Sequence, residues 1–295
     1  MLAEVSVRDA TPADAPAIAE LLNAHSLALF AESDLVAATV AGWFELPRVV
    51  WFGLAERDGR ILGYADLQQS DAHADIDART LDPAAAHTLV QSCVERAGAD
   101  APIRGYAPAM DEPASSAYRA AGFRIIRHSF TMEIELDEAG AAPEWPDGVT
   151  VRPWREGDDP AFHAALEEAF ADHFGFEPRS FGEWRHDLDV RPETDRSLWY
   201  LALDGDDVAG AAICSWHSSG DRTFGWVGEL GVRAPWRRRG LGLALLRHAF
   251  AELGRRGATR VGLGVDAENT TGAVRLYERA GMHVTRRYDT WELGR

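Results

Sequence analysis

Residues 232–244 read Val232-Arg-Ala-Pro-Trp-Arg-Arg-Arg-Gly-Leu-Gly-Leu-Ala244, and they lead from an apolar segment through a basic, glycine-containing turn into a helix-forming run. Gly240 and Gly242 have no side chain, so the backbone there can approach a ligand closely. The first turn of the following helix leaves unpaired N–H groups at the positive end of its dipole, which favours a phosphate group. Three arginines, 237 to 239, add positive charge in a chain whose net charge is −17. The turn is therefore predicted to bind a pyrophosphate.

The segments that follow this turn continue the pattern. Leu241 to Arg256 has the apolar spacing of an amphipathic helix, and Thr259 to Val265 alternates as a β-strand does. Other phosphate-binding motifs do not fit. The chain has no Gly-x-x-x-x-Gly-Lys-Ser/Thr, and the Rossmann Gly-x-Gly-x-x-Gly is absent at this turn.

The spacing Arg-x-x-Gly-x-Gly resembles the acetyl-CoA-binding turn of the GNAT family of N-acetyltransferases, whose pattern is Gln/Arg-x-x-Gly-x-Gly/Ala. A later stretch matches the family's Asn-x-x-Ala…Tyr…Gly-Phe at Asn269, Ala273, Tyr277 and Gly281, with Met282 in place of the Phe. The matching motifs extend from about residue 226 to residue 293, in the order that the family shows. The combination is more specific than the turn alone.

The start of the second half agrees with this resemblance. We expect a strand at Val149–Arg152, a helix at Pro160–Ala171, and a hairpin closed at Asp204-Gly205-Asp206. The fold class that the resemblance implies is α/β (an α+β mixed sheet). It predicts two tandem GNAT folds, each with a central mixed, mostly antiparallel sheet flanked by helices.

The first half is predicted to be a diverged copy of the second. Residues 117–133 align without a gap to residues 276–292, so that Tyr118 falls on Tyr277 and Glu133 on Glu292. Where the basic glycine turn is due, the first copy has the acidic segment Asp71–Asp82. We therefore expect a degenerate GNAT-like domain at 1–138, a linker at 139–148 and a catalytic domain at 149–295. A length of 295 residues suits two domains.

Composition narrows the other possibilities. The acidic balance argues against nucleic acid as a partner, because phosphate neutralisation needs a broad basic face. No run is apolar enough to span a membrane, and the N-terminus has no signal-type pattern, so we expect a cytoplasmic protein. Cys93 and Cys214 are the only cysteines, and neither a disulfide nor a thiol nucleophile is expected. All basic residues are Arg, as in GC-rich coding sequences, which suggests an actinomycete source. No cluster has metal-ligand spacing.

The resemblance also implies roles for individual residues. Acetyl-CoA is the expected co-substrate, held by backbone groups of the turn, while Asn269 contacts its pantetheine arm or caps the next helix. The cofactor-binding set is predicted as Leu230, Val232, Arg237, Arg238, Arg239, Gly240, Leu241, Gly242, Leu243, Ala244 and Asn269. Tyr277 is the candidate general acid for the departing thiolate, with core packing as the alternative reading. Glu229 is the candidate base; alternatively it faces solvent and water deprotonates the amine.

The acceptor is expected near residues 170–184, the region between the first two helices. Carboxylates beside aromatic rings suit a cationic amine. The candidate substrate residues are Asp172, His173, Glu177 and His217, although a surface loop anchored by its aromatic residues explains residues 170–184 equally well. The expected activity is direct acetyl transfer to a small primary amine, with no metal.

Two alternatives stay open. The tandem arrangement resembles two-domain actinobacterial acetyltransferases of the mycothiol synthase type, so the acceptor is alternatively a cysteinyl pseudo-disaccharide. A chain that binds acyl-CoA without turnover, as a sensor, is the alternative from another class.

Overall fold

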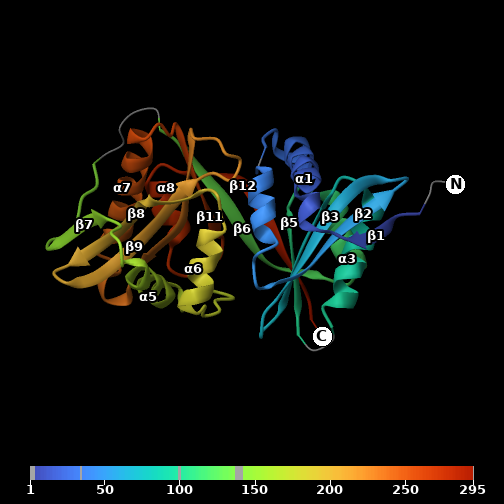
Figure 1. The fold of residues 1–295 in the computed structure, drawn as a ribbon. Coiled ribbons are helices and arrows are strands. Elements are labelled where there is room, and N and C mark those ends of the chain that lie inside the picture. Colours follow the sequence, from blue (N-terminus) through green and yellow to red (C-terminus); the bar gives the residue numbers. More distant parts are fainter. Residues whose placement is uncertain (1–3, 34, 99–100, 137–141, 295) are drawn as a thin grey trace. The chain divides into compact units, whose positions relative to one another are not determined.

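The computed structural model describes residues 4–33, 35–98, 101–136 and 142–294, and contacts divide the chain into two units (Figure 1). The first unit contains Met1–Ser129 together with Arg286–Arg295, and the second contains Phe130–Thr285. Two strands, β6 (Arg124–Glu135) and β12 (His283–Leu293), begin in one unit and end in the other. The mixed sheet flanked by helices, predicted for each half, is confirmed.

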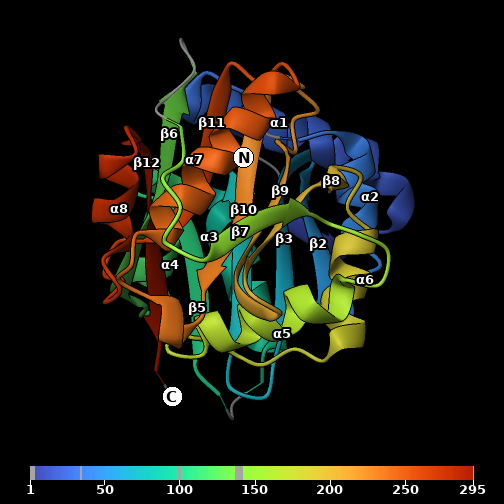
Figure 2. The same ribbon diagram turned by 90° about the vertical axis from the view of Figure 1, so that its left-hand side faces the viewer.

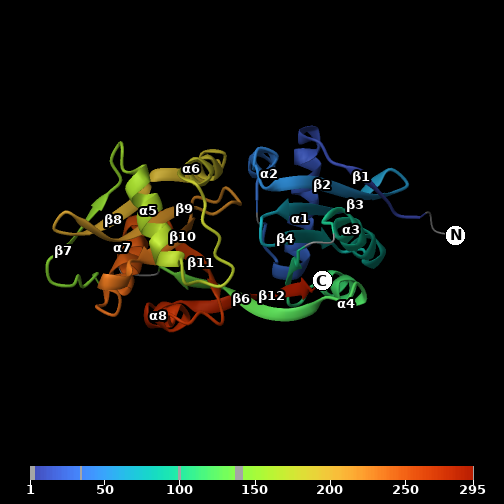
Figure 3. The ribbon, with the colours of Figure 1, turned by 90° about the horizontal axis from the view of Figure 1, so that it is seen from below.

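The first unit is built on a sheet in the order β1-β2-β3-β4-β5-β12. Helix α1 packs on one face of this sheet through a cluster that contains Tyr64, while α3 covers the other face through Ala65 and Leu67 (Figure 3). Successive residues of one strand thus point to opposite faces of the sheet. The elements of this unit before β6 are β1 (Ser6–Asp9), η1 (Pro12–Asp14), α1 (Ala15–Phe30), α2 (Ala37–Trp43), β2 (Val49–Arg57), β3 (Arg60–Gln69), β4 (Ala74–Thr80), α3 (Pro83–Arg96), β5 (Ile103–Pro108) and α4 (Glu112–Ala120).

The second unit has the strand order β6-β11-β10-β9-β8-β7 (Figure 2). Helix α5 lies close against one face, since a Cβ on Gly231 would meet Ala169 at 2.8 Å, and α7 packs on the other face against Gly210 and Gly225. The elements between β6 and β12 are β7 (Val149–Pro153), α5 (Asp159–Phe170), α6 (Phe181–Asp189), β8 (Thr194–Asp204), β9 (Asp207–Trp216), β10 (Phe224–Val232), η2 (Ala234–Trp236), α7 (Leu241–Arg255), β11 (Arg260–Asp266) and α8 (Ala273–Arg279). The predicted hairpin is present, with Gly205 at φ 61° in its turn.

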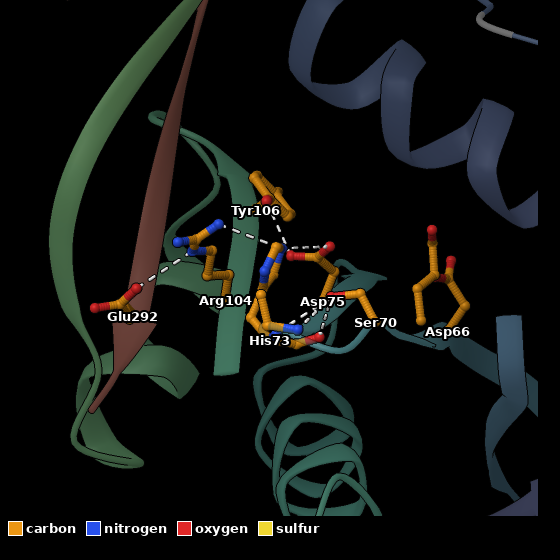
Figure 4. Close-up of polar contacts among 9 residues, drawn as sticks. Asp66, Ser70, His73, Asp75, Arg104, Tyr106 and Glu292 are labelled. Carbon is orange, nitrogen blue, oxygen red and sulfur yellow. Dashed lines mark hydrogen bonds and ion pairs between the residues drawn. The ribbon is translucent and has the colours of Figure 1, made fainter. Parts of the chain in front are cut away.

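Each unit receives one sheet strand from the other half of the sequence. In the first unit, β12 pairs with β5 from Tyr288↔Pro108 to Leu293↔Ile103, and Glu292 of β12 forms an ion pair with Arg104 at 3.2 Å (Figure 4). In the second unit, Glu133 of β6 forms the matching ion pair with Arg260, also at 3.2 Å. The two glutamates are the ones that the internal alignment superposes. The two copies have therefore exchanged equivalent strands.

This exchange differs from a division into consecutive segments. The sequence analysis predicts domains at 1–138 and 149–295, whereas residues 130–136 contribute to the second unit and residues 286–294 to the first. Of the predicted linker, residues 139–141 lie outside the described residues, and residues 142–148 precede β7.

The acidic segment of the first half forms β4 and the start of α3. Asp82 is the N-cap of α3, where its carboxylate accepts hydrogen bonds from the N–H groups of Ala84 and Ala85 and forms an ion pair with Arg57 at 2.8 Å. In the same unit, the ring of Tyr118 lies against Gly105 of β5. A Cβ added to Gly105 would come within 2.3 Å of this ring. Both the helix end and the space beside β5 are thus filled by the unit's own side chains.

Candidate active site

Strands β10 and β11 open a slot in the second unit. They pair in parallel only at Phe224↔Arg260, Gly225↔Val261 and Trp226↔Gly262. Beyond these pairs β10 continues to Val232 and β11 to Asp266, without pairing to each other. The inner edges of both strands therefore carry backbone groups that are free of the sheet ladder at that point.

A bulge in β10 contributes to the opening. Its register with β9 shifts between Val227 and Glu229, so Gly228 has no partner residue. An extra residue in one strand bends it and increases its twist. Glycine, which has no side chain, suits such a bulge.

The slot leads to the start of helix α7. Gly240 is the N-cap at φ 88°, and no side chain among the described residues hydrogen-bonds to this end of the helix. The first N–H groups of a helix have no acceptor within it, and the dipole of a 15-residue helix adds positive potential there. The turn has a second left-handed residue, Arg238, at φ 65°. The local geometry can thus accept an anionic group.

A cavity of about 1170 Å³ joins the slot to the helix end. Of the predicted cofactor residues, the ones that line it are Leu230, Val232, Arg237, Arg238, Gly240, Leu241, Gly242, Leu243 and Asn269. Arg239 and Ala244 do not line it. Ala244 is on the inner side of α7 and is 1% exposed, because it packs in the core beneath the helix.

Arg237 has a structural role at this site. Its guanidinium donates to the backbone oxygens of Val232 and Ala169 and forms an ion pair with Asp172 at 2.8 Å. The hydrogen bond from Arg237 holds the pKa of Asp172 below its usual range. Arg237 therefore ties the turn to the end of α5, and the charge of Asp172 is matched within the protein.

Asn269 lies in the loop between β11 and α8. Its side-chain oxygen accepts from the backbone N–H of Thr271 at 2.7 Å, and the residue lines the cavity. The N-cap of α8 is Gly272, so the alternative role of Asn269 as a helix cap is not seen. The side chain instead closes a short Asx-type turn.

Tyr277 lines the slot from α8. Burial raises the pKa of its hydroxyl to about 12. Among the residues that the structure describes, none forms a hydrogen bond with this hydroxyl. A protonated, unbonded O–H beside the slot is what a general acid requires.

Glu229 does not line the cavity. Its carboxylate is half-buried and forms an ion pair with Arg179 at 3.3 Å. The backbone of Arg179 is fixed to α5, since its N–H donates to Glu167 and its oxygen is 2.8 Å from the Nε2 atom of His163. Glu229 therefore faces the segment between α5 and α6, where the acceptor was predicted, rather than open solvent.

The four predicted substrate residues separate into two pairs. Asp172 and His173 line the cavity, and burial lowers the pKa of His173. Glu177 and His217 do not line it. The ring of His217 stacks on Phe224 at 4.3 Å and hydrogen-bonds with Ser219, which places it at the far end of β10.

Several lining residues escaped the sequence analysis. They come from the end of α5, from η2, from β11 and from α8, and the main ones are Phe170, Trp236, Leu263, Val265, Arg275, Leu276 and Arg279. The spacing of Arg275 and Arg279, one helical turn apart on the helix of Tyr277, was a usable signal.

The cysteines and the possible metal ligands bear on other kinds of chemistry. Both cysteines are free and buried, and burial raises the pKa of Cys93 and brings that of Cys214 to about 12, so thiolate chemistry is disfavoured. Within the described ranges, no group of three or more His, Cys, Asp or Glu side chains is placed to bind a metal ion. Nor does any helix in the described part of the chain have the length and apolarity to cross a membrane.

Comparison with known proteins adds four findings. A model of the acetyltransferase (GNAT) family matches residues 155–282. The mycothiol acetyltransferase of Geodermatophilus obscurus is 34% identical over 244 residues, which cover 76% of each protein. The crystal structure of a GCN5-related N-acetyltransferase from Sphaerobacter thermophilus has a TM-score of 0.79 and 35% identity, with 98% of this chain and 95% of that chain covered. A tandem GNAT protein from the clavulanic acid biosynthesis pathway, at 16% identity and a TM-score of 0.74 over 98% of each chain, shares the fold.

Proposed function

Because the chain belongs to the GNAT acetyltransferase family, we propose that its second unit transfers the acetyl group of acetyl-CoA directly to a primary amine, without an acyl-enzyme. The observation that carries this proposal is the slot between β10 and β11, which ends at the uncapped start of α7 and is lined by Tyr277. The slot suits an extended chain, and the helix start suits the anionic group at the end of that chain.

Each part of the co-substrate has a counterpart in the slot. The backbone N–H groups at Gly240–Leu243 would bind the pyrophosphate, with Arg238 beside them. Arg237 would act through the turn, since its guanidinium is already engaged by Asp172. The unpaired edge of β10 near Val232 would polarise the thioester carbonyl through a backbone N–H.

Tyr277 would donate the proton that the leaving thiolate needs. Its raised pKa means that it keeps this proton at neutral pH, so it is available as an acid and not as a base. In the proposed geometry the hydroxyl has no competing protein partner among the described residues. Substrate binding would therefore not have to break an existing hydrogen bond.

Glu229 would accept the proton of the amine, directly or through water. Its carboxylate forms an ion pair with Arg179, in the segment between α5 and α6, and does not line the cavity. In the free protein, the guanidinium of Arg179 donates a hydrogen bond to this carboxylate. A cationic acceptor would compete with Arg179 for Glu229, which makes binding of the amine sensitive to both residues.

The acceptor class is supported by the relatives. One protein named mycothiol acetyltransferase is 34% identical to this chain over three quarters of its length. We therefore favour the amine of a cysteinyl pseudo-disaccharide, of the kind that the mycothiol name implies, over a simple small amine. The amine of either class would suit the carboxylate of Glu229.

Chromatographic detection of the acetylated product, after incubation of the full chain with acetyl-CoA, tests this proposal. The acceptor panel should contain the cysteinyl pseudo-disaccharide, its non-cysteinyl amine and several small primary amines. We expect turnover with the first and at least a 100-fold lower kcat/KM with the others, a difference of about 3 kcal/mol.

Two outcomes would contradict the proposal. Equal turnover of all amines would contradict the proposed acceptor, but it would still agree with acetyl transfer from acetyl-CoA. Tight acetyl-CoA binding with no turnover across the panel would instead favour an acyl-CoA sensor.

A further inference from the structure

Several charged side chains line the cavity. Four of them are arginines, Arg237, Arg238, Arg275 and Arg279, and three are acids, Asp172, Asp266 and Glu278. Arg237 is paired with Asp172, whereas the other three form no ion pair with any residue that the structure describes. In a chain with net charge −17, unpaired arginines gathered around one cavity indicate a highly charged anionic ligand.

Two of these arginines belong to a helix that touches the phosphate-binding turn. A Cβ on Gly242, in the first turn of α7, would lie 3.1 Å from the Cδ1 atom of Leu276 in α8. Leu276 is flanked in α8 by Arg275 and Arg279, which are four residues apart and share one side of the helix. The absence of a side chain at Gly242 therefore lets α8 bring both arginines next to the turn.

The chemistry of coenzyme A supplies a second anionic group. Besides its pyrophosphate, the molecule carries a phosphomonoester at the 3′ position of the ribose, with a charge of about −1.5 to −2 at neutral pH. Guanidinium groups bind such an ester through paired hydrogen bonds. Arg238 belongs to the turn itself, which leaves the arginines of α8 for this second group.

We propose that Arg275 and Arg279 bind the 3′-phosphate of the co-substrate, so that the protein distinguishes coenzyme A from 3′-dephospho-coenzyme A. This inference rests on the proposed function, since it assumes that coenzyme A occupies the cavity. It assigns to α8 a second role beside the placement of Tyr277. The selectivity of the site then comes from a helix other than the one that binds the pyrophosphate.

Calorimetric titration of both ligands tests the proposal without any need for turnover. The variants are the parent, an Arg275→Gln/Arg279→Gln double variant, and an Arg119→Gln/Arg124→Gln control in the first unit. The control also removes two positive charges, at exposed positions in the first unit. We expect the parent and the control to bind coenzyme A about 10- to 100-fold more tightly than the dephospho form, as one or two charged hydrogen bonds would give. The α8 variant should bind the two ligands within about threefold of each other, with little change for the dephospho form.

The other outcomes overturn specific parts of the proposal. Equal binding of the two ligands by the parent would refute the role of the 3′-phosphate while leaving the proposed function in place. An equal loss of affinity for both ligands in the α8 variant would mean that these arginines act on another part of the molecule. If the parent binds neither ligand, the proposed function itself fails.

A Glu278→Gln variant adds a check on the sign of the effect. Glu278 also lines the cavity from α8, so its removal should raise affinity for coenzyme A more than for the dephospho form. A loss of affinity on this substitution would contradict a phosphate-binding role for this side of the helix.

Discussion

The starts of helices α3 and α7 hold equivalent places in the two units, yet one is closed and the other open. At α3 the carboxylate of Asp82 accepts from two backbone N–H groups, and Pro83 has no N–H to offer. At α7 the N-cap is Gly240, and no side chain of a described residue bonds to the helix end. The first unit thus carries an internal anion where the second is proposed to receive one from its ligand. A helix end becomes a binding site only when the chain does not satisfy it itself.

The two aligned tyrosines show the same contrast. Tyr118 is fully buried, and its hydroxyl donates to the backbone oxygen of Ile76. Tyr277 is half-buried, and its hydroxyl bonds to no described residue. The strands beside them differ as well, because β4 and β5 pair at four positions of a seven-residue strand, while β10 and β11 pair at three positions of a nine-residue strand. A longer unpaired stretch leaves room for a ligand, whereas in the first unit the ring of Tyr118 lies against Gly105, which is paired with Ile76.

The strongest test converts the open helix end into the closed one. A Gly240→Asp variant should lower acetyl-CoA affinity at least about 100-fold, because its carboxylate would take the free N–H groups and repel a diphosphate. Gly240→Asn is the matched control, since both residues tolerate a positive φ to a similar extent. It should lower the affinity by about 10-fold or less. Equal affinities of the two variants in calorimetry would show that charge at this position is unimportant.

Exchange of each tyrosine for phenylalanine separates catalysis from packing. Tyr277→Phe should reduce kcat by about 100-fold with little change in acetyl-CoA affinity, as expected for loss of a general acid. Tyr118→Phe should leave kcat unchanged and lower the free energy of unfolding by about 1 kcal/mol, because the buried oxygen of Ile76 loses its donor.

The pH dependence of kcat tests the role of Tyr277 independently. Because the pKa of Tyr277 is raised to about 12, its hydroxyl keeps its proton well below pH 12 and loses it as the pH rises through that value. The parent kcat should therefore show no decline from this group between pH 8 and 10. If the two phenylalanine variants were equally active, the contrast between the tyrosines would have no catalytic meaning.

The smallest expected effect comes from opening the closed helix end. Asp82→Ala should lower the free energy of unfolding by about 1–2 kcal/mol, through loss of the cap and of the pair with Arg57. Calorimetry should still find one acetyl-CoA site per chain, since Tyr118 continues to fill the space beside Gly105. A second site in this variant would mean that the cap alone keeps the first unit from binding.

The sequence was sufficient to predict much of the fold. The glycine turn and the hairpin at Gly205 depend on local backbone chemistry, and the internal repeat depends on the spacing of residues within each copy, so all three can be read from the sequence. The exchange of β6 and β12 could not be predicted in this way. Their aligned sequences are interchangeable in pattern, so each would suit either sheet, and only the complete set of contacts assigns Glu133 to Arg260 and Glu292 to Arg104.

The site was predicted less completely than the fold. Arg237, Arg238 and Arg239 are equivalent as sequence, but their environments differ: the first is bound by Asp172, the second lines the cavity, and the third does neither. The side on which Glu229 lies also depends on the bulge at Gly228, which changes the alternation of β10. Such differences follow from geometry that no local pattern encodes.

The exchanged strands have a consequence for biosynthesis. A ribosome adds residues in order, so β12, which completes the sheet of the first unit beside β5, is made only after the whole of the second unit. Until then, the backbone groups of β5 on that side have no strand to pair with, and an exposed edge of this kind is open to wrong partners. The second unit faces no such delay, since residues 130–135 precede it. The half that is made first is therefore the half that finishes folding last.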